Sequence, residues 1–93
     1  MKVNFYATLR EKVGKKTIDF DIPSGATIGV LIQKMVNQFP DLRVALVDAD
    51  GQLRSHVHVF VNGRDVPYLE NQMDTVLLED DTVSVFPAVG GGQ

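Results

Sequence analysis

Hydrophobic and polar residues alternate at the start of the chain. In segment 2–10 the apolar residues fall on every second position: Val3, Phe5, Ala7 and Leu9. A period of two predicts a strand with one buried face. Segment 17–23 alternates in the same way, with Ile18, Phe20 and Ile22 on one face. Because Gly14 and two lysines lie between the segments, the pair predicts a β-hairpin.

The period then changes to that of an amphipathic helix. The apolar residues now recur three or four positions apart: Ile28, Leu31, Ile32, Met35, Val36 and Phe39. This spacing predicts a helix with one buried face. Thr27 is the predicted N-cap, because its hydroxyl can accept a hydrogen bond from a first-turn amide, and Pro40 ends the helix. We expect Gly29, in the first turn, to allow close approach to the sheet.

The second half of the chain predicts two further strands. A short helical turn is expected at 42–46, before a turn at Asp50–Gly51. Segment 56–66, HVHVFVNGRDV, predicts a strand that runs into Asn62–Gly63. That pair favours a tight hairpin turn, because both residues tolerate positive φ. Segment 71–81 predicts a loop with one helical turn, and segment 81–87, DTVSVFP, predicts the last strand.

The order of these elements predicts an α+β fold. Only one long apolar stripe is available to cover a face of the sheet, which leaves the other face to water or to a partner. The order suggests a β-grasp, a mixed sheet of four to five strands with one main helix on one face and the first and last strands side by side. We expect this domain to span 1–87. Residues 88–93 are expected to form a flexible tail, since glycine loses the most backbone entropy on ordering.

Composition excludes several classes of chemistry. The chain has 93 residues, a net charge of −3 and no cysteine. The absence of cysteine removes disulfides, thiolate catalysis and Cys-ligated metal. Scattered basic residues give no stripe for nucleic acid, and no apolar run reaches the ~20 residues that span a bilayer. Because the start also lacks the apolar block of a signal peptide, we expect a cytoplasmic protein without nucleic-acid or membrane partners.

Two polar groups are candidate sites of low specificity. His56 and His58 are two positions apart, hence on one face of the predicted strand. A metal or pH-sensing role is open, but two solvated positions are the simpler interpretation. Segment 79–81, EDD, predicts a solvated turn rather than a magnesium site. We therefore expect no metal site, and the sequence contains no readable nucleophile–base pair of an enzyme.

The alternation also predicts an aromatic surface. If the apolar strand positions face the helix, then Tyr6, Phe60 and Phe86 face away from it. In a β-grasp their strands are neighbours, so the rings are expected to form one patch, and exposed aromatic clusters mark interaction sites. Alternatively, loops half-cover the rings, which then contribute only local stability. Pro87 and Val89, between the last strand and the glycines, belong to the same predicted partner-binding surface.

Three segments resemble the MoaD/ThiS-like family of β-grasp sulfur carriers. They are VNGRDV at 61–66, LLEDDTVSVFPAV at 77–89 and the terminal glycines. The family includes the small subunit of molybdopterin synthase and carriers of thiamine and cysteine synthesis, and ubiquitin-like modifiers of archaea are relatives. FPAVGGG at 86–92 is similar to the family's ending. On that match Gly91 and Gly92 take the place of its diglycine, and Gly90 replaces an alanine.

The resemblance implies a carrier without catalytic residues of its own. A ubiquitin-activating-type enzyme would adenylate the terminal carboxylate with ATP and magnesium, and the chain itself would bind no cofactor. Sulfur would then displace AMP to give a thiocarboxylate, which supplies the large subunit of molybdopterin synthase or another sulfur-accepting enzyme. Two alternatives stay open. The chain could modify lysines of other proteins through the same glycine, or it could be a non-reactive domain that binds through its sheet.

The sequence departs from the family's pattern at two positions. Asp80 stands where glycine is usual, and we expect the turn to form because Asp tolerates left-handed backbone. Gln93 follows the glycine at which the family's chemistry occurs. We predict that a protease removes Gln93 before Gly92 is activated, because exposed termini are readily cleaved. Alternatively, Gln93 carries the carboxylate and fits an activating enzyme poorly, or the tail is inert.

Overall fold

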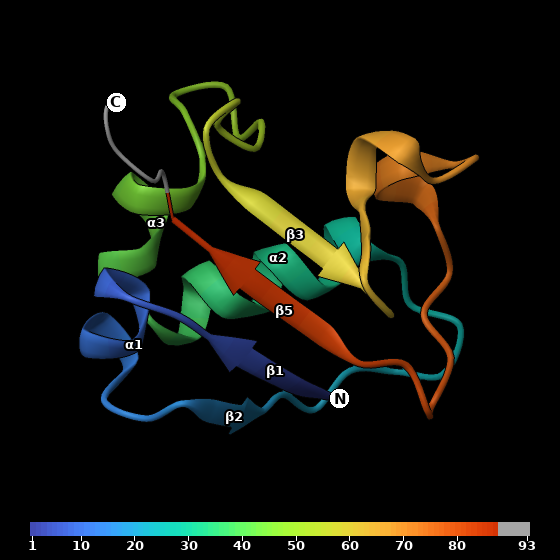
Figure 1. Cartoon of the computed structure of the whole chain (residues 1–93), viewed down its shortest axis with the longest axis horizontal. Coiled ribbons are helices and arrows are strands. Elements are labelled where there is room, and N and C mark those ends of the chain that lie inside the picture. Colours follow the sequence, from blue (N-terminus) through green and yellow to red (C-terminus); the bar gives the residue numbers. More distant parts are fainter. Residues whose placement is uncertain (88–93) are drawn as a thin grey trace.

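The structure is built on one five-stranded mixed β-sheet (Figure 1). The computed structural model describes residues 1–87. The strand order is β2-β1-β5-β3-β4. The strands are β1 Lys2–Phe5, β2 Thr17–Asp19, β3 His58–Val61, β4 Arg64–Asp65 and β5 Val83–Phe86. The central strands β1 and β5 are parallel, with Val3 opposite Val83. This confirms the predicted β-grasp, with the first and last strands side by side.

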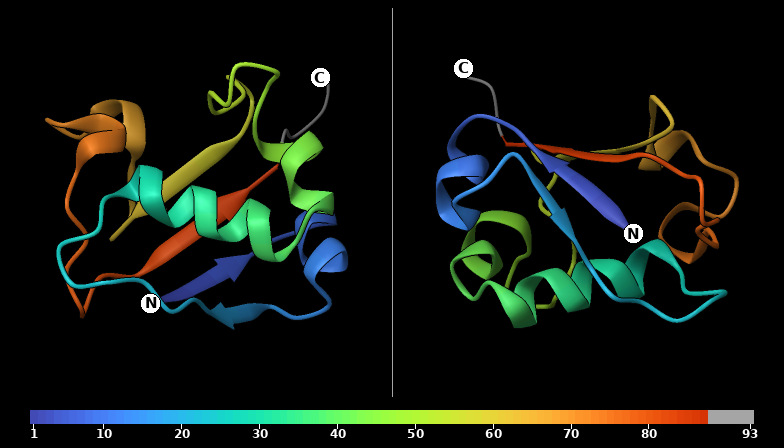
Figure 2. Two further views of the ribbon diagram at one scale, coloured as in Figure 1. Left: turned by 180° about the vertical axis from the view of Figure 1, so that it is seen from behind. Right: turned by 90° about the horizontal axis from the view of Figure 1, so that it is seen from below.

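The helices of the described chain lie on one side of the sheet. They are α1 Thr8–Val13, α2 Ile28–Gln38 and α3 Asp41–Leu46. Two 3-10 turns, η1 Val66–Tyr68 and η2 Gln72–Asp74, follow β4. Seen from below, the sheet lies above the three helices, and no described helix covers its other face (Figure 2). The predicted open face is therefore confirmed for residues 1–87.

The main helix α2 forms where the apolar period predicts it. Its buried residues follow the predicted stripe: Ile28, Leu31, Ile32, Met35 and Val36. The Thr27 hydroxyl accepts a hydrogen bond from the Val30 amide at 3.3 Å, so the predicted N-cap is confirmed. Phe39, before Pro40, leaves helical angles at φ −125° and ψ 86°. The helix is thus defined at both ends by local sequence.

The predicted first strand is wrong beyond Phe5. Ala7, expected to face the core, is exposed and has φ 54° and ψ −131°, which interrupts the strand. Thr8–Val13 then forms α1, which buries Leu9 and Val13 on one side. Residues four apart share a helix face, so the same apolar residues fit a helix as well as a strand. β1 and β2 still pair antiparallel, but α1 separates them in place of a tight hairpin turn.

Gly29 does not play the predicted role of bringing the helix close to the sheet. A Cβ atom built at Gly29 would meet the Met73 carbonyl oxygen at 3.5 Å and the Thr27 Oγ1 at 3.7 Å. Both distances are ordinary van der Waals contacts, and Met73 belongs to η2 rather than to the sheet. The position therefore has room for a methyl group.

We expect Gly29→Ala to stabilise the protein. Alanine restricts the unfolded chain more than glycine, which favours the helix by about 0.5–1 kcal/mol. Urea unfolding should show the midpoint moving upward with an unchanged slope. Gly63→Ala is the control that should lose stability, because Gly63 has φ 84°. A lower midpoint for Gly29→Ala would mean that the contact with Met73 is strained.

Asn62 joins two turns at the end of the sheet. Asn62 and Gly63 have φ 53° and 84°, as expected for the Asn-Gly hairpin turn. The side-chain amide of Asn62 donates from Nδ2 to Asp81 Oδ1 at 2.8 Å, and its Oδ1 accepts from the Thr82 backbone amide at 2.9 Å. Asp81 Oδ2 also accepts from the Leu78 amide. The turn before β5 forms as expected, but Asp80 is not among the described residues with left-handed backbone.

We expect Asn62→Ala to destabilise the protein by about 1–2 kcal/mol. The substitution removes two partly solvated hydrogen bonds and places a β-carbon in left-handed backbone. Asn62→Gly removes only the hydrogen bonds, so it should cost less. Urea unfolding of both variants separates the two causes. Equal losses would show that the backbone conformation contributes nothing.

Candidate functional site

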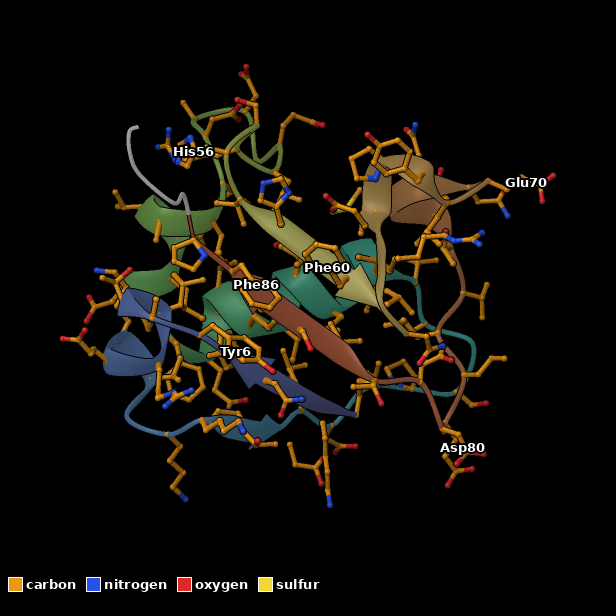
Figure 3. The ribbon with its side chains drawn as sticks, in the orientation of Figure 1. Tyr6, His56, Phe60, Glu70, Asp80 and Phe86 are labelled. Carbon is orange, nitrogen blue, oxygen red and sulfur yellow. The ribbon has the colours of Figure 1, made fainter. Side chains whose placement is uncertain are left out.

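Three aromatic rings lie in line across the open face of the sheet (Figure 3). The Phe86 ring stacks on the Tyr6 ring, with 4.3 Å between centroids and 10° between planes. Phe86 also meets Phe60 edge to face, at 5.4 Å and 88°. All three side chains are half-buried. We call Tyr6, Phe60 and Phe86 the aromatic cluster.

The strand alternation places these rings on the open face. Val59, Val83 and Val85 are fully buried on the helix side, so Phe60 and Phe86 point the other way. The Tyr6 amide donates to the Val85 carbonyl at 3.2 Å, which extends the pairing of β1 with β5 by one residue. This contact brings the Tyr6 ring over Phe86. The predicted juxtaposition of the three rings is therefore confirmed, while their role in partner binding stays a prediction.

His58 and Asp65 form a polar pair at one side of the aromatic cluster. In the register of β3 and β5, His58 lies opposite Phe86. Its Nδ1 is 2.7 Å from Asp65 Oδ2, and its ring centroid is 6.1 Å from that of Phe60. The His58 side chain is 44% exposed and that of Asp65 is 14% exposed. The aromatic cluster is thus bordered on this side by the His58 imidazole and the Asp65 carboxylate.

The partner of His58 differs from the one considered from the sequence. Sequence reasoning compared His58 with His56, which is exposed in the segment before β3. The structure pairs it with Asp65, which lies opposite Phe60 across the hairpin. Because Asn62–Gly63 forms a two-residue turn, this register follows from the sequence, and it is the signal that could have identified Asp65.

A neutral polar group bounds the cluster on its other side. Asn4 lies opposite Thr17 on β2 and opposite Ser84 on β5. The Thr17 hydroxyl donates to Asn4 Oδ1 at 2.6 Å. Ser84 lies in turn opposite Phe60, so these residues share the open face with the rings. The open face therefore presents a central aromatic strip with polar residues around it.

The aromatic cluster adjoins the point where the tail begins. Phe86 is the last residue of β5, and Pro87, the last described residue, is half-buried. The predicted site residues Val89, Gly91 and Gly92 lie outside the described residues, as do Gln93 and the expected tail boundary. A protein that covers the cluster would thus also lie close to Pro87, the last described residue.

Residues 1–87 contain no group of three or more His, Asp or Glu side chains placed to hold a metal ion. The EDD segment at 79–81 instead serves the turn before β5, through the contacts of Asp81 with Asn62 and Leu78. Within the same range no helix has the length and apolar character needed to cross a membrane. The candidate site is therefore the aromatic cluster with the His58–Asp65 pair.

Comparisons with known proteins agree with this architecture. The model of the ThiS family matches residues 3–92. Small archaeal modifier protein 3 of Haloferax volcanii is 39% identical over 92 residues, which is 99% of this chain and 98% of that protein. The sulfur carrier protein CysO of Mycobacterium tuberculosis is 30% identical over 81 residues, covering 85% and 83% of the two chains.

Solved structures show the same fold. The crystal structure of SAMP1 from Haloferax volcanii has a TM-score of 0.86 at 28% identity, covering 99% of this chain and 98% of that one. A chain in the Amycolatopsis orientalis BexX/CysO complex has a TM-score of 0.79 at 26% identity, with 98% of each chain covered. The fold of this chain is thus shared with a small archaeal modifier protein and with a chain of the BexX/CysO complex.

Proposed function

Because the chain belongs to the ThiS family of sulfur carriers and small archaeal modifier proteins, we propose that a partner enzyme converts the terminal carboxyl group of Gly92 into a thiocarboxylate. Carriers of this family are non-catalytic, so the chain is acted upon by other proteins. The observation that carries the proposal is the aromatic cluster, which lies on the open face of the sheet directly before the tail.

The proposed chemistry begins with activation of the terminal carboxylate. A carboxylate oxygen of Gly92 attacks the α-phosphorus of ATP and releases pyrophosphate, with magnesium held by the partner. Hydrosulfide supplied to the partner then attacks the acyl carbon, the acyl–phosphate bond breaks and AMP leaves, and loss of the thiol proton gives the thiocarboxylate. Activation is needed because a free carboxylate is a poor acyl donor. The cycle consumes ATP, which agrees with the cytoplasmic location expected from the sequence.

Glycine suits the end of such a chain for a steric reason. A residue without Cβ lets the backbone extend through a narrow passage and be approached from both faces. Gln93 has a long side chain and occupies the end of the chain in this sequence. We therefore propose that a protease hydrolyses the Gly92–Gln93 bond first, which exposes the Gly92 carboxylate.

The receiver of the sulfur is an enzyme that accepts sulfur from a thiocarboxylate. The large subunit of molybdopterin synthase and the enzymes of thiamine or cysteine synthesis all fit the same chemistry. A CysO chain of this fold has been solved with BexX, which supports docking of the folded carrier on another protein.

Protein modification is the second candidate function. Its support is the 39% identity to small archaeal modifier protein 3, which extends over nearly the whole of both chains. In this reaction the amine of a lysine attacks the activated Gly92 carbonyl, and an isopeptide bond replaces the bond to AMP. Both candidates share the first step, so one chain can serve both.

Intact mass spectrometry of the untagged protein from its own cells tests the proposal. We expect a species that has lost Gln93 and has exchanged one oxygen for one sulfur. Conjugates of higher mass, with Gly92 joined to lysine, would support modification instead. A chain that always retains Gln93 and never gains sulfur or a bonded protein would contradict both functions.

We expect Phe86→Ala to impair activation far more than folding. Loss of a central aromatic contact at an interface costs about 2 kcal/mol, or roughly 30-fold in affinity. The measured KM for the carrier in pyrophosphate release should rise accordingly, with kcat preserved. Tyr68→Ala is the matched control, because Tyr68 is an aromatic residue outside the cluster with 78% exposure. Equal increases in KM for the two variants would show that the aromatic cluster is not part of the docking surface.

A further inference from the structure

We infer that His58 is a specificity-determining residue of the docking surface, whose Nε2 atom accepts a hydrogen bond from the partner. Asp65 is its positioning residue, because it holds the imidazole in the tautomer that leaves Nε2 free to accept. The inference rests on the proposed function, since it concerns the protein that covers the aromatic cluster. It adds to that function a chemical requirement on the partner.

The tautomer follows from the group that faces Nδ1. Asp65 Oδ2 lies 2.7 Å from His58 Nδ1. An ionised carboxylate has only acceptor sites, so the proton of this hydrogen bond belongs to Nδ1. A neutral imidazole with its proton on Nδ1 has a lone pair on Nε2. His58 therefore presents an acceptor at its outer edge.

The position of the ring makes this acceptor part of the surface. His58 is opposite Phe86 in the sheet, and its ring centroid is 6.1 Å from that of Phe60. A protein that covers the rings also removes water from the exposed part of His58. A buried acceptor without a donor is costly. The partner must therefore place a donor there, such as a backbone amide, a lysine or an arginine.

Within residues 1–87, the charged group that pairs with His58 is Asp65. On β5 the residues of the open face are Ser84 and Phe86, which carry no charge. Arg64 lies opposite Val61, on the other side of the sheet by register. From the segment before β3, Arg54 Nε donates to the Val44 carbonyl, and His56 is exposed. Among these described groups, Asp65 is therefore the one that contacts the His58 ring nitrogen.

Asp65→Asn changes the tautomer while keeping the contact. The asparagine amide can donate to Nδ1, which moves the imidazole proton to Nε2. The outer edge of His58 then becomes a donor, although the side chain keeps its neighbour. If the His58–Asp65 pair served only to hold β4 against β3, Asp65→Asn would leave docking unchanged. The variant keeps a hydrogen bond between the two side chains, so it should lose little stability in either case. The two roles are thereby separated.

Nitrogen NMR of the histidine ring in the free protein tests the tautomer. We expect the proton on Nδ1 in the wild type and on Nε2 in Asp65→Asn. Activation kinetics test docking, with the organism's own ubiquitin-activating-type adenylating enzyme, ATP and magnesium as the probe. For Asp65→Asn and His58→Leu the KM for the carrier should rise about tenfold with kcat unchanged, the effect of one unpaired donor.

Matched variants make the kinetic result specific. His58→Gln can present an amide oxygen near the former Nε2 and should stay within about threefold of the wild type. His56→Gln alters an exposed histidine nearby and should change nothing.

Each outcome separates the inference from the proposed function. A wild-type chain, trimmed to Gly92, that is never adenylated would contradict the proposed function and the docking role with it. Normal adenylation with an unchanged KM for Asp65→Asn, after the tautomer has shifted, would overturn only the inference. A wild-type ring with its proton on Nε2 would also overturn it, whatever the kinetics.

Discussion

Replacing Gly91 and Gly92 together by alanine is expected to abolish activation of the chain and to leave its thermal unfolding unchanged. The proposed adenylation requires the terminal carboxylate to reach the α-phosphorus of ATP in line. Two methyl groups in a passage shaped for bare backbone would displace the carboxylate, and a misplacement of about 1 Å costs about 100-fold in rate. Pyrophosphate release measures the loss, and calorimetry measures the unfolding.

Gly90→Ala is the matched control for this prediction. The resemblance described above implies an alanine in the family at the position of Gly90, so this substitution adds the same methyl group one residue earlier. We expect activation of Gly90→Ala to be close to that of the wild type. A chain that ends at Gly92, made by deleting Gln93, should be activated without prior proteolysis. Activation of the double alanine variant at the normal rate would exclude the diglycine as the reacting end.

The face of each strand was predictable because the period of two leaves little choice. Once Val83 and Val85 face the core, Phe86 must face outward, and the same holds for Phe60 beside Val59. Sequence reasoning therefore identified the aromatic cluster before the rings could be placed. The parallel pairing of β1 with β5 followed from the order of elements rather than from any local signal.

The end of β1 was not predictable by the same rule. Leu9 continues the alternation of Val3 and Phe5, but it also lies four residues before Val13. Short apolar segments fit a strand and a helix equally well. The backbone of Ala7, at φ 54°, decides between them, and nothing about alanine indicates such an angle in advance.

The two side-chain pairs differ in how far the sequence could have predicted them. Asn62 and Asp81 are 19 positions apart, and their hydrogen bond depends on how two turns meet at the end of the sheet. His58 and Asp65 are closer in sequence, but their contact requires the register of the hairpin. The His58–Asp65 pair could therefore have been derived from the Asn62–Gly63 turn, whereas no local signal connects Asn62 with Asp81.

Phe20→Ala is expected to cost about 3–5 kcal/mol of stability, because it empties the centre of the core. Phe20 is fully buried, and its ring meets Phe5 at 6.2 Å and Phe39 at 6.0 Å, both edge to face. Small domains have only about 5–15 kcal/mol in total. For a chain of this size the Tm should fall by roughly 15 °C or more, as measured by calorimetry.

Phe60→Ala makes the same truncation on the open face and so isolates the effect of burial. Phe60 is half-buried and already partly hydrated, so its loss should cost about 1 kcal/mol of stability. Docking should respond in the opposite order: Phe60→Ala should weaken activation, while the folded fraction of Phe20→Ala should be activated normally. This reversal is expected because Phe20 supports the core, whereas Phe60 lies on the open face that we propose as the docking surface. Equal losses of stability would mean that the open face is covered within the chain itself, leaving no aromatic surface for a partner.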